Sequence, residues 1–235
     1  MRYLGGKQKA AGSLVAAMAP TLRGRVLWDA FCGGLNVAGK AAEVCQVIAS
    51  DRDPALIALH RAVHSGWDPP ASVTEDEFLA ARSLPDSDPR KAFAAFGCSF
   101  GGKWGSAYAR GEGRNYAAES ARSLTRDARR CAVILQLDFM TVQPFFDPSL
   151  VIYCDPPYRG TTGYRLGAFD SDAFWTRAAE WAALGVPVFV SEFSAPQGWS
   201  VVWTRVQKAR MARKKDVEAV MVEKLFYRGP SVCNT

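Results

Sequence analysis

The sequence has few of the residues that build metal centres or disulfide frameworks. Its six cysteines are scattered and show no Cys-x-x-Cys spacing, which disfavours both a zinc site and a secreted disulfide scaffold. His60 and His64 lie four residues apart without a third ligand, so we expect them on an exposed helix face rather than at a metal. No apolar run approaches the roughly 20 residues of a membrane-spanning helix. These absences favour the reducing cytoplasm, with no metal and no membrane partner.

The length and composition of the chain predict one domain with a modest excess of positive charge. With 235 residues, of which 49% are hydrophobic, the chain can bury a full core and carry a small insertion. The net charge of +6 suits a polyanionic partner, although many proteins without such a partner are equally basic.

The most informative stretch is an apolar run, residues 150–154, that ends at Asp155-Pro156-Pro157-Tyr158. The run predicts a buried strand, and two prolines without backbone N–H groups predict a rigid turn at its carboxyl end. Open α/β sheets bind ligands at that end of their strands. A carboxylate and a carbonyl there can accept hydrogen bonds from a planar amine, while Tyr158 stacks on the ring. An ordinary turn covered by a half-buried tyrosine explains the four residues equally well.

A second predicted strand, residues 25–31, leads into a glycine loop and a helix, the beginning of a βαβ unit. The loop at Gly33 and Gly34 matches neither the dinucleotide-binding fingerprint nor a P-loop, so nicotinamide and ATP lack their motifs. The next strand ends at Asp51, roughly 20 residues further on, where a carboxylate can accept hydrogen bonds from ribose hydroxyls. We expect Asp53 to cap the helix that follows.

These motifs carry a resemblance to a known family. Asp155-Pro156-Pro157-Tyr158 resembles the catalytic motif of the amino-group DNA methyltransferases, in the form that their adenine-specific members have. Phe31-Cys32-Gly33-Gly34-Leu35 is similar to the Phe-x-Gly-x-Gly loop of S-adenosylmethionine enzymes, except that Leu35 stands where the family usually has a small residue. The order and spacing of these motifs, together with those that follow, resemble the Dam-like DNA adenine-N6 methyltransferases.

Two further elements extend the resemblance. Tyr3 and Lys7 flank a double glycine before a helix that we expect to run to about Met18 and to be closed by Pro20. Dam-type enzymes begin with a similar element whose lysine reaches the carboxylate of S-adenosylmethionine. Asp138 and Phe139 end a predicted strand, residues 132–137. The resembling enzymes have such a pair, in which the acid accepts a hydrogen bond from the cofactor's adenine amine and the ring packs on the base.

The resemblance implies an α/β protein with a Rossmann-like methyltransferase sheet, in which residues 1–65 and 131–235 form the catalytic domain. Residues 66–130 would form an inserted, mainly helical target-recognition region. The implied reaction transfers a methyl group from S-adenosylmethionine to an adenine flipped out of double-stranded DNA, in a bacterial or phage-infected cell. The flipped amine would donate to Asp155 and to the Pro156 carbonyl, and Tyr158 would stack on the ring.

Candidate DNA contacts lie in two basic segments. Cations and aromatic rings alternate between residues 99 and 116, a composition that suits phosphates and unstacked bases. A second basic segment joins two predicted strands, residues 200–206 and 217–226, as a hairpin tip. In both segments a solvated loop is the alternative. The candidate residues are Lys103, Arg110, Arg114, Lys208, Arg210 and Arg213.

Three other functions fit part of the sequence. An N4-cytosine methyltransferase would use the same fold, usually with serine in place of Asp155. A methyltransferase acting on RNA or on a protein amine would share the cofactor half but would not need the insertion. A catalytically silent nucleic-acid-binding protein would keep the basic loops without needing Asp138 or Asp155. The shortness of the insertion also predicts a small or relaxed recognition sequence.

Overall fold

The computed structural model describes residues 1–158, 166–209 and 219–230, and within these ranges it contains one mixed sheet. The strand order is β3-β2-β1-β4-β5-β7-β6, with β7 antiparallel to both of its neighbours and the other pairs parallel. This is the α/β, Rossmann-like methyltransferase sheet that was predicted. The strands are β1 (Val26–Asp29), β2 (Gln46–Asp51), β3 (Val133–Gln136), β4 (Leu150–Cys154), β5 (Val188–Glu192), β6 (Ser200–Ala209) and β7 (Ala219–Arg228).

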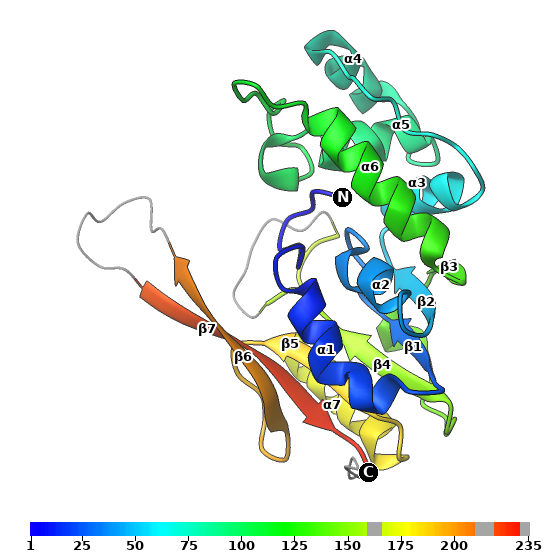
Figure 1. Ribbon diagram of the computed structural model, residues 1–235, viewed down its shortest axis with the longest axis vertical. Coiled ribbons are helices and arrows are strands. Elements are labelled where there is room, and N and C mark those ends of the chain that lie inside the picture. The colour runs from blue at the N-terminus through cyan, green and yellow to red at the C-terminus, as the bar shows by residue number, and fades with distance from the viewer. Residues whose placement is uncertain (159–165, 210–218, 231–235) are drawn as a thin grey trace.

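Helices cover both faces of the sheet (Figure 1). None of the helices in the described ranges is long and apolar enough to cross a membrane. The helices are α1 (Ala11–Leu22), α2 (Asn36–Ala41), α3 (Pro54–His64), α4 (Glu75–Ala80), α5 (Pro89–Ala92), α6 (Tyr116–Arg130) and α7 (Ser171–Ala183), with short turns η1 (Ala81–Ser83), η2 (Phe93–Gly97), η3 (Phe100–Gly102) and η4 (Phe139–Thr141).

Alternating strand residues divide the core between the two faces. Leu27 and Val151 pack with α1, α2 and α3, whereas their neighbours Trp28 and Ile152 pack with α7. On the α7 face, Trp181 is fully buried and makes an edge contact with Trp28 at 5.7 Å between ring centroids. Both faces of the central strands are therefore apolar, which leaves their carboxyl ends as the place for polar groups.

The segment 66–130 lies between α3 and β3 and is mainly helical, as expected. Its short helix α4 begins with a capping box, in which the Thr74 side chain accepts from the Glu77 backbone N–H and the Glu77 carboxylate accepts from the Thr74 backbone N–H. The longer α6 begins at Asn115, whose side chain accepts from the Ala118 N–H at 2.9 Å. In Figure 1, α4 sits at the top of the molecule, and α6 runs from there alongside α3 toward α2 and β3.

Two predictions about local structure are wrong. Helix α1 does not end at Pro20 but continues to Leu22. Pro20 is exposed and removes only a hydrogen bond to Ala16, which is also exposed, while the buried Leu22 keeps the last turn on the core. His60 is not on an exposed face either, because its side chain is fully buried, whereas His64 is exposed.

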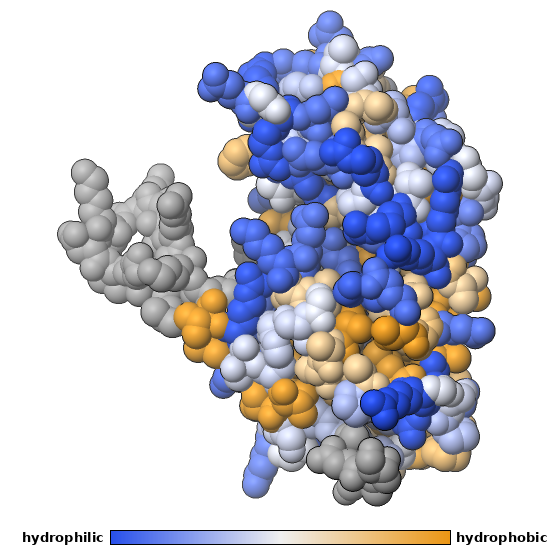
Figure 2. All heavy atoms as spheres, viewed as in Figure 1, coloured by the Kyte–Doolittle hydropathy of each residue, from blue (hydrophilic) through white to orange (hydrophobic). Residues whose placement is uncertain are grey.

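The β6–β7 hairpin extends away from the body (Figure 1). Apolar side chains are exposed along it, with Val206 64% and Met221 39% accessible (Figure 2). Of the predicted DNA contacts, Lys208 lies in the last part of β6, residues 207–209, where the structure describes the backbone alone. Arg210 and Arg213 lie outside the described residues.

Helix packing predicts opposite effects on stability when two helical glycines, Gly39 and Gly12, are replaced by alanine. A Cβ atom added at Gly39 in α2 would lie 2.5 Å from the Cβ of Asp127, which is buried in α6, so Gly39→Ala should destabilise the fold by about 1–3 kcal/mol. Gly12 in α1 is exposed, and its added Cβ would meet only the Lys40 side chain, at 4.0 Å. Gly12→Ala should therefore stabilise the fold by about 0.5–1 kcal/mol. Urea denaturation of both variants tests the contrast, and an equal response of the two would contradict it.

Candidate active site

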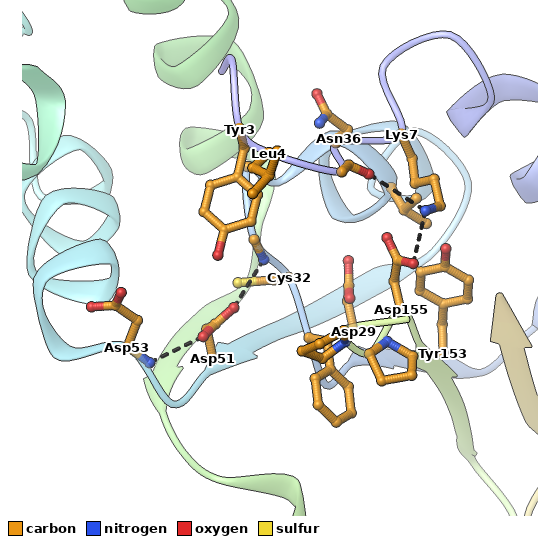
Figure 3. Close-up of a pocket in the computed structure, with 18 of the residues that line it drawn as sticks. Tyr3, Leu4, Lys7, Asp29, Cys32, Asn36, Asp51, Asp53, Tyr153 and Asp155 are labelled. Carbon is orange, nitrogen blue, oxygen red and sulfur yellow. Dashed lines mark hydrogen bonds and ion pairs between the residues drawn. The ribbon is translucent and has the colours of Figure 1, made fainter. Parts of the chain in front are cut away.

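A cavity of about 270 Å³ opens at the carboxyl ends of three neighbouring strands (Figure 3). Asp29 ends β1, Asp51 ends β2, and Asp155 follows β4, so each strand delivers one acid to the same edge of the sheet. The cavity brings together most of the residues predicted from the sequence to bind cofactor or substrate. These are Tyr3, Lys7, Phe31, Gly33, Gly34, Asp51, Asp155, Pro156, Pro157 and Tyr158.

Asp51 ties the second strand to the glycine loop. One carboxylate oxygen accepts from the Gly33 N–H at 3.1 Å and the other from the Asp53 N–H at 3.0 Å. Burial raises the pKa of Asp51 to about 6. A carboxylate offers about four acceptor positions, so this one can still accept from two hydroxyls. Asp53 caps α3 as predicted, accepting from the N–H groups of Ala55 and Leu56.

The glycines of the loop permit a close approach by the amino-terminal segment. Gly33 has a φ of +44°, and a Cβ added there would lie 3.0 Å from a Tyr3 ring carbon. A Cβ added at Gly34 would lie 2.9 Å from the Tyr3 Cβ. Tyr3 therefore lies directly on the loop, and on its other side it packs against Phe96 at 5.1 Å between ring centroids.

Leu35 continues the loop in a backbone conformation that is unusual for its residue type. It has a φ of +61° and is fully buried at the start of α2. Such a conformation costs roughly 1–3 kcal/mol in a branched residue, which is similar to what burying a leucine side chain returns. The residue that departs from the family pattern is thus accommodated by filling the core beneath the loop.

His60 supports the same loop from below and was missed by the sequence analysis as a member of the site. Its Nε2 lies 2.7 Å from the Gly33 carbonyl oxygen. Burial lowers the pKa of His60 to about 4, so the ring is neutral at physiological pH. Because a carbonyl can only accept, Nε2 carries the hydrogen. The spacing of Leu56, His60 and Val63 along α3 was the available signal, since these positions share one helix face.

Lys7 sits among acids on the other side of the cavity. Its Nζ lies 2.8 Å from Asp155 and 3.2 Å from Glu223, and it also donates to the Tyr158 hydroxyl. Burial lowers the pKa of Lys7, but the two acids outweigh that effect and hold the pKa above its ordinary value. Burial also raises the pKa of Asp155 to about 6, although Lys7 opposes this shift. The expected contact of Lys7 with a cofactor carboxylate stays a prediction.

Asp29 is a second buried acid that the sequence analysis did not select. It is 1% exposed and lines the cavity, with one oxygen accepting from the Ala38 N–H at 3.1 Å. Within the described part of the chain, its Oδ1 has no hydrogen-bond partner. Burial, followed by the charges of Asp155 and Asp51, raises the pKa of Asp29 to about 8. Its place at a strand end, like that of Asp51, was the signal that could have found it.

Asp138 and Phe139 lie at different depths. Asp138 lines a hollow that shares Arg52 and Leu166 with the main cavity, and its carboxylate accepts from the Met140 N–H at 2.9 Å. Phe139 is 1% exposed and packs 5.7 Å from Phe31, itself a cavity residue. The acid is thus at the rim and the ring is in the core, behind Phe31. Their predicted contacts with a cofactor base stay predictions.

The candidate DNA contacts in the insertion are at the surface. Arg110 forms an ion pair with Glu75, and Arg114 pairs with Glu119 through its Nε at 3.1 Å. Lys103 is exposed. The two arginines would have to exchange acidic partners for phosphates if they bind DNA.

No protein-family model and no curated protein matches this sequence. Among solved structures, similar folds include the magnesium protoporphyrin IX methyltransferase of Synechocystis PCC 6803 with bound S-adenosylmethionine, which is 13% identical with a TM-score of 0.44. That match covers 97% of this chain and 81% of the other. An rRNA methyltransferase from Streptomyces viridochromogenes is 15% identical with a TM-score of 0.39, over 92% of this chain and 81% of the other. These likenesses are distant, and the strand order and directions define the fold.

The raised pKa of Asp29 predicts how stability depends on pH. The folded state holds a proton on this acid up to about pH 8, whereas an unfolded chain releases it near the ordinary value of 3.8. Stability should therefore fall as pH rises between these values. Asp29→Asn has no carboxyl group to titrate and can keep the hydrogen bond from Ala38. The difference in free energy of unfolding between this variant and the wild type should therefore grow by roughly 1 kcal/mol for each unit of rising pH. Thermal unfolding between pH 4 and pH 9 measures it.

The exposed Asp76 supplies the matched control, because Asp76→Asn makes the same chemical change at the surface. A wild type and an Asp29→Asn variant whose unfolding temperatures stay parallel across that pH range would contradict the assignment.

Proposed function

We propose that this protein is an S-adenosylmethionine-dependent methyltransferase that acts on the exocyclic amine of adenine in DNA. The observation that carries the proposal is the convergence of Asp29, Asp51 and Asp155 on one cavity beside a glycine loop. Several buried acids repel the phosphates of a nucleotide cofactor and attract a cation. S-adenosylmethionine is such a ligand, because it combines a ribose with a sulfonium and an ammonium group.

The residues at the cavity fit the parts of this cofactor. Asp51 has acceptor positions for the ribose hydroxyls, and the unpartnered Oδ1 of Asp29 suits the ammonium group. Gly33 and Gly34 keep side chains out of the intervening space, and Asp138 stands at the rim for the adenine amine. When bound, S-adenosylmethionine supplies the methyl group.

Asp155 and the turn that follows it would hold the target amine. The turn lines the cavity, and its prolines have no N–H groups to compete for the acceptors. Extrusion of an adenine from the duplex costs a few kcal/mol. The amine would then donate to Asp155 and to the Pro156 carbonyl while its nitrogen attacks the methyl carbon. The bond from that carbon to sulfur would break with its electron pair left on sulfur, and the methylated nitrogen would pass its extra proton to Asp155. Positive charge develops on that nitrogen, and the Asp155 carboxylate in its buried setting stabilises it.

DNA as the substrate is supported by the elements around the cavity. Figure 1 shows the helical insertion above the amino-terminal segment that carries Lys7 and the β6–β7 hairpin beside it. Two protruding elements next to a cavity can hold a duplex while one base leaves the stack. The net charge of +6 favours a polyanion in the same way.

The proposal predicts the product and the acid that it requires. Unmethylated duplex DNA incubated with labelled S-adenosylmethionine should yield N6-methyladenine, identified by mass spectrometry of the nucleosides. Asp155→Ala should lower the rate by about a thousandfold, because it removes the charge opposite the developing cation. Binding of S-adenosylhomocysteine to the variant, measured by calorimetry, controls for loss of the fold. N4-methylcytosine as the product, or no DNA product from a wild type that binds the cofactor, would contradict the adenine assignment.

A second prediction concerns recognition. The insertion of residues 66–130 contains only short helices before α6, so few side chains are available to contact base edges. Sequencing of methylated sites on a random duplex library should therefore reveal a short or relaxed recognition sequence. Methylation confined to one long sequence would contradict this expectation.

A further inference from the structure

A buried glutamate from the last strand completes the group of charges around Asp155. Glu223 lies in β7, at a position that faces the same side of the sheet as Leu225 and is fully buried. Its Oε1 lies 3.2 Å from the Lys7 Nζ and accepts from the Tyr158 hydroxyl at 3.0 Å. Neither the motifs nor the function proposed above assigns it a role.

The contacts of Lys7 raise a problem for the proposed reaction. Lys7 lies 2.8 Å from Asp155 Oδ1, and so competes with the target amine for that carboxylate. Lys7 is only 8% exposed, so water cannot readily solvate its ammonium group if it leaves Asp155. A buried charge that loses its partner costs several kcal/mol. Release of Asp155 therefore requires another acceptor within reach of Lys7.

We propose that Glu223 is the positioning residue that holds Lys7 and Tyr158 while Asp155 turns its carboxylate to the substrate amine. This inference rests on the function proposed above. Glu223 contacts both partners while Lys7 also pairs with Asp155, so the exchange needs no large movement of Lys7. Lys7 also lies over the Tyr158 ring, 4.6 Å from its centroid, which couples the position of the stacking ring to the same ammonium group.

The balance of charge supports this role. Lys7 contributes one positive charge, and the two carboxylates paired with it contribute two negative ones. The group therefore has one negative charge in excess, which matches the charge that develops on the amine as the methyl carbon approaches. Without Glu223, Lys7 would neutralise Asp155 and weaken the stabilisation of that cation.

The first test compares Glu223→Gln with Glu180→Gln, the same change at an exposed site in α7 where Glu180 pairs only locally with Arg177. On duplex DNA, Glu223→Gln should lower kcat by about tenfold or more, with a smaller change in KM, because ground-state binding of the duplex involves other surfaces. Glu180→Gln should behave as the wild type. A Glu223→Gln variant that loses thermal stability but keeps the wild-type kcat would overturn the inference, since that pattern indicates a structural role.

A second test does not depend on catalysis. The titration of Asp155 can be followed in the ligand-free protein by the ¹³C signal of its carboxyl carbon, assigned with Asp155→Asn. The groups around this carboxyl are Lys7, Asp29, Tyr153, Tyr158, Glu192 and Glu223. Glu223→Gln removes a negative charge near Asp155 and leaves Asp155 as the carboxylate that pairs with Lys7. The midpoint of the Asp155 titration should therefore fall by about one pH unit or more. An unchanged midpoint would overturn the inference.

A double-mutant cycle with Lys7→Met tests whether Glu223 acts through the lysine. In the Lys7→Met background, Glu223→Gln should change kcat by much less than in the wild type. Equal effects in both backgrounds would overturn the inference. If Glu223→Gln alone does not fold, the double variant still can, because both partners of the buried pair are removed together. In that case Lys7→Met alone and the double variant should have similar kcat values, and a large difference between the two would overturn the inference.

These measurements separate the inference from the function on which it rests. A wild type that methylates no nucleic acid base would remove the proposed function, while the Asp155 titration would still report on the Lys7–Glu223 arrangement. A wild type that methylates adenine, beside a Glu223→Gln variant with unchanged kcat and titration, would remove the inference alone.

Discussion

The burial of several carboxyl groups at one edge of the sheet is the constraint on which the rest of the site depends. Parallel strands point their carboxyl ends the same way, so Asp29, Asp51 and Asp155 meet at one cavity. Burial is the largest cause that raises the pKa of each acid, to about 8 for Asp29 and to about 6 for Asp51 and Asp155, and the charges of Asp155 and Asp51 add to the shift at Asp29. Neighbouring groups stabilise these carboxylates. Backbone N–H groups of Gly33 and Asp53 donate to Asp51, and Lys7 forms an ion pair with Asp155.

Lys7, the cation at this site, is far from its acidic partners in the sequence. Lys7 precedes the first helix, and the two acids that hold it follow β4 and lie in β7. The antiparallel insertion of β7 between β5 and β6 makes this meeting possible, because it brings the last strand next to the centre of the sheet. The strand order that defines the fold therefore also determines which charges face the cavity.

The sequence predicted the parts of the site that follow local rules. A strand end, a glycine loop and a helix cap each depend on neighbouring residues, and Gly33, Asp51 and Asp53 lie where such rules place them. Glu223 does not follow from them, because its partners are set by strand pairing across the sheet. Its position among the core-facing residues of β7 was nonetheless a signal, since a charge at a buried strand position needs a partner.

Other differences between expectation and structure arise where packing overrides local preference. Pro20 was expected to end a helix, yet the burial of Leu22 holds one more turn. His60 has a polar ring that is usually exposed, yet the glycine loop offers it a carbonyl in the interior. Leu35 adopts a backbone conformation that favours glycine, and its side chain fills the space below the loop. His60 and Leu35 thus support the glycine loop from the core.

The same electrostatics links binding to protonation. Asp29 holds its proton at neutral pH because burial, and then the charges of the neighbouring acids, raise its pKa to about 8, and its Oδ1 has no hydrogen-bond partner within the described part of the chain. A cationic ligand beside it reverses that balance, since an opposite charge favours the ionised form. Binding of such a ligand then releases a proton, and its affinity increases as the pH approaches 8. A neutral or anionic ligand does not favour the ionised form of Asp29, so the buried acids of the cavity select a ligand with positive charge.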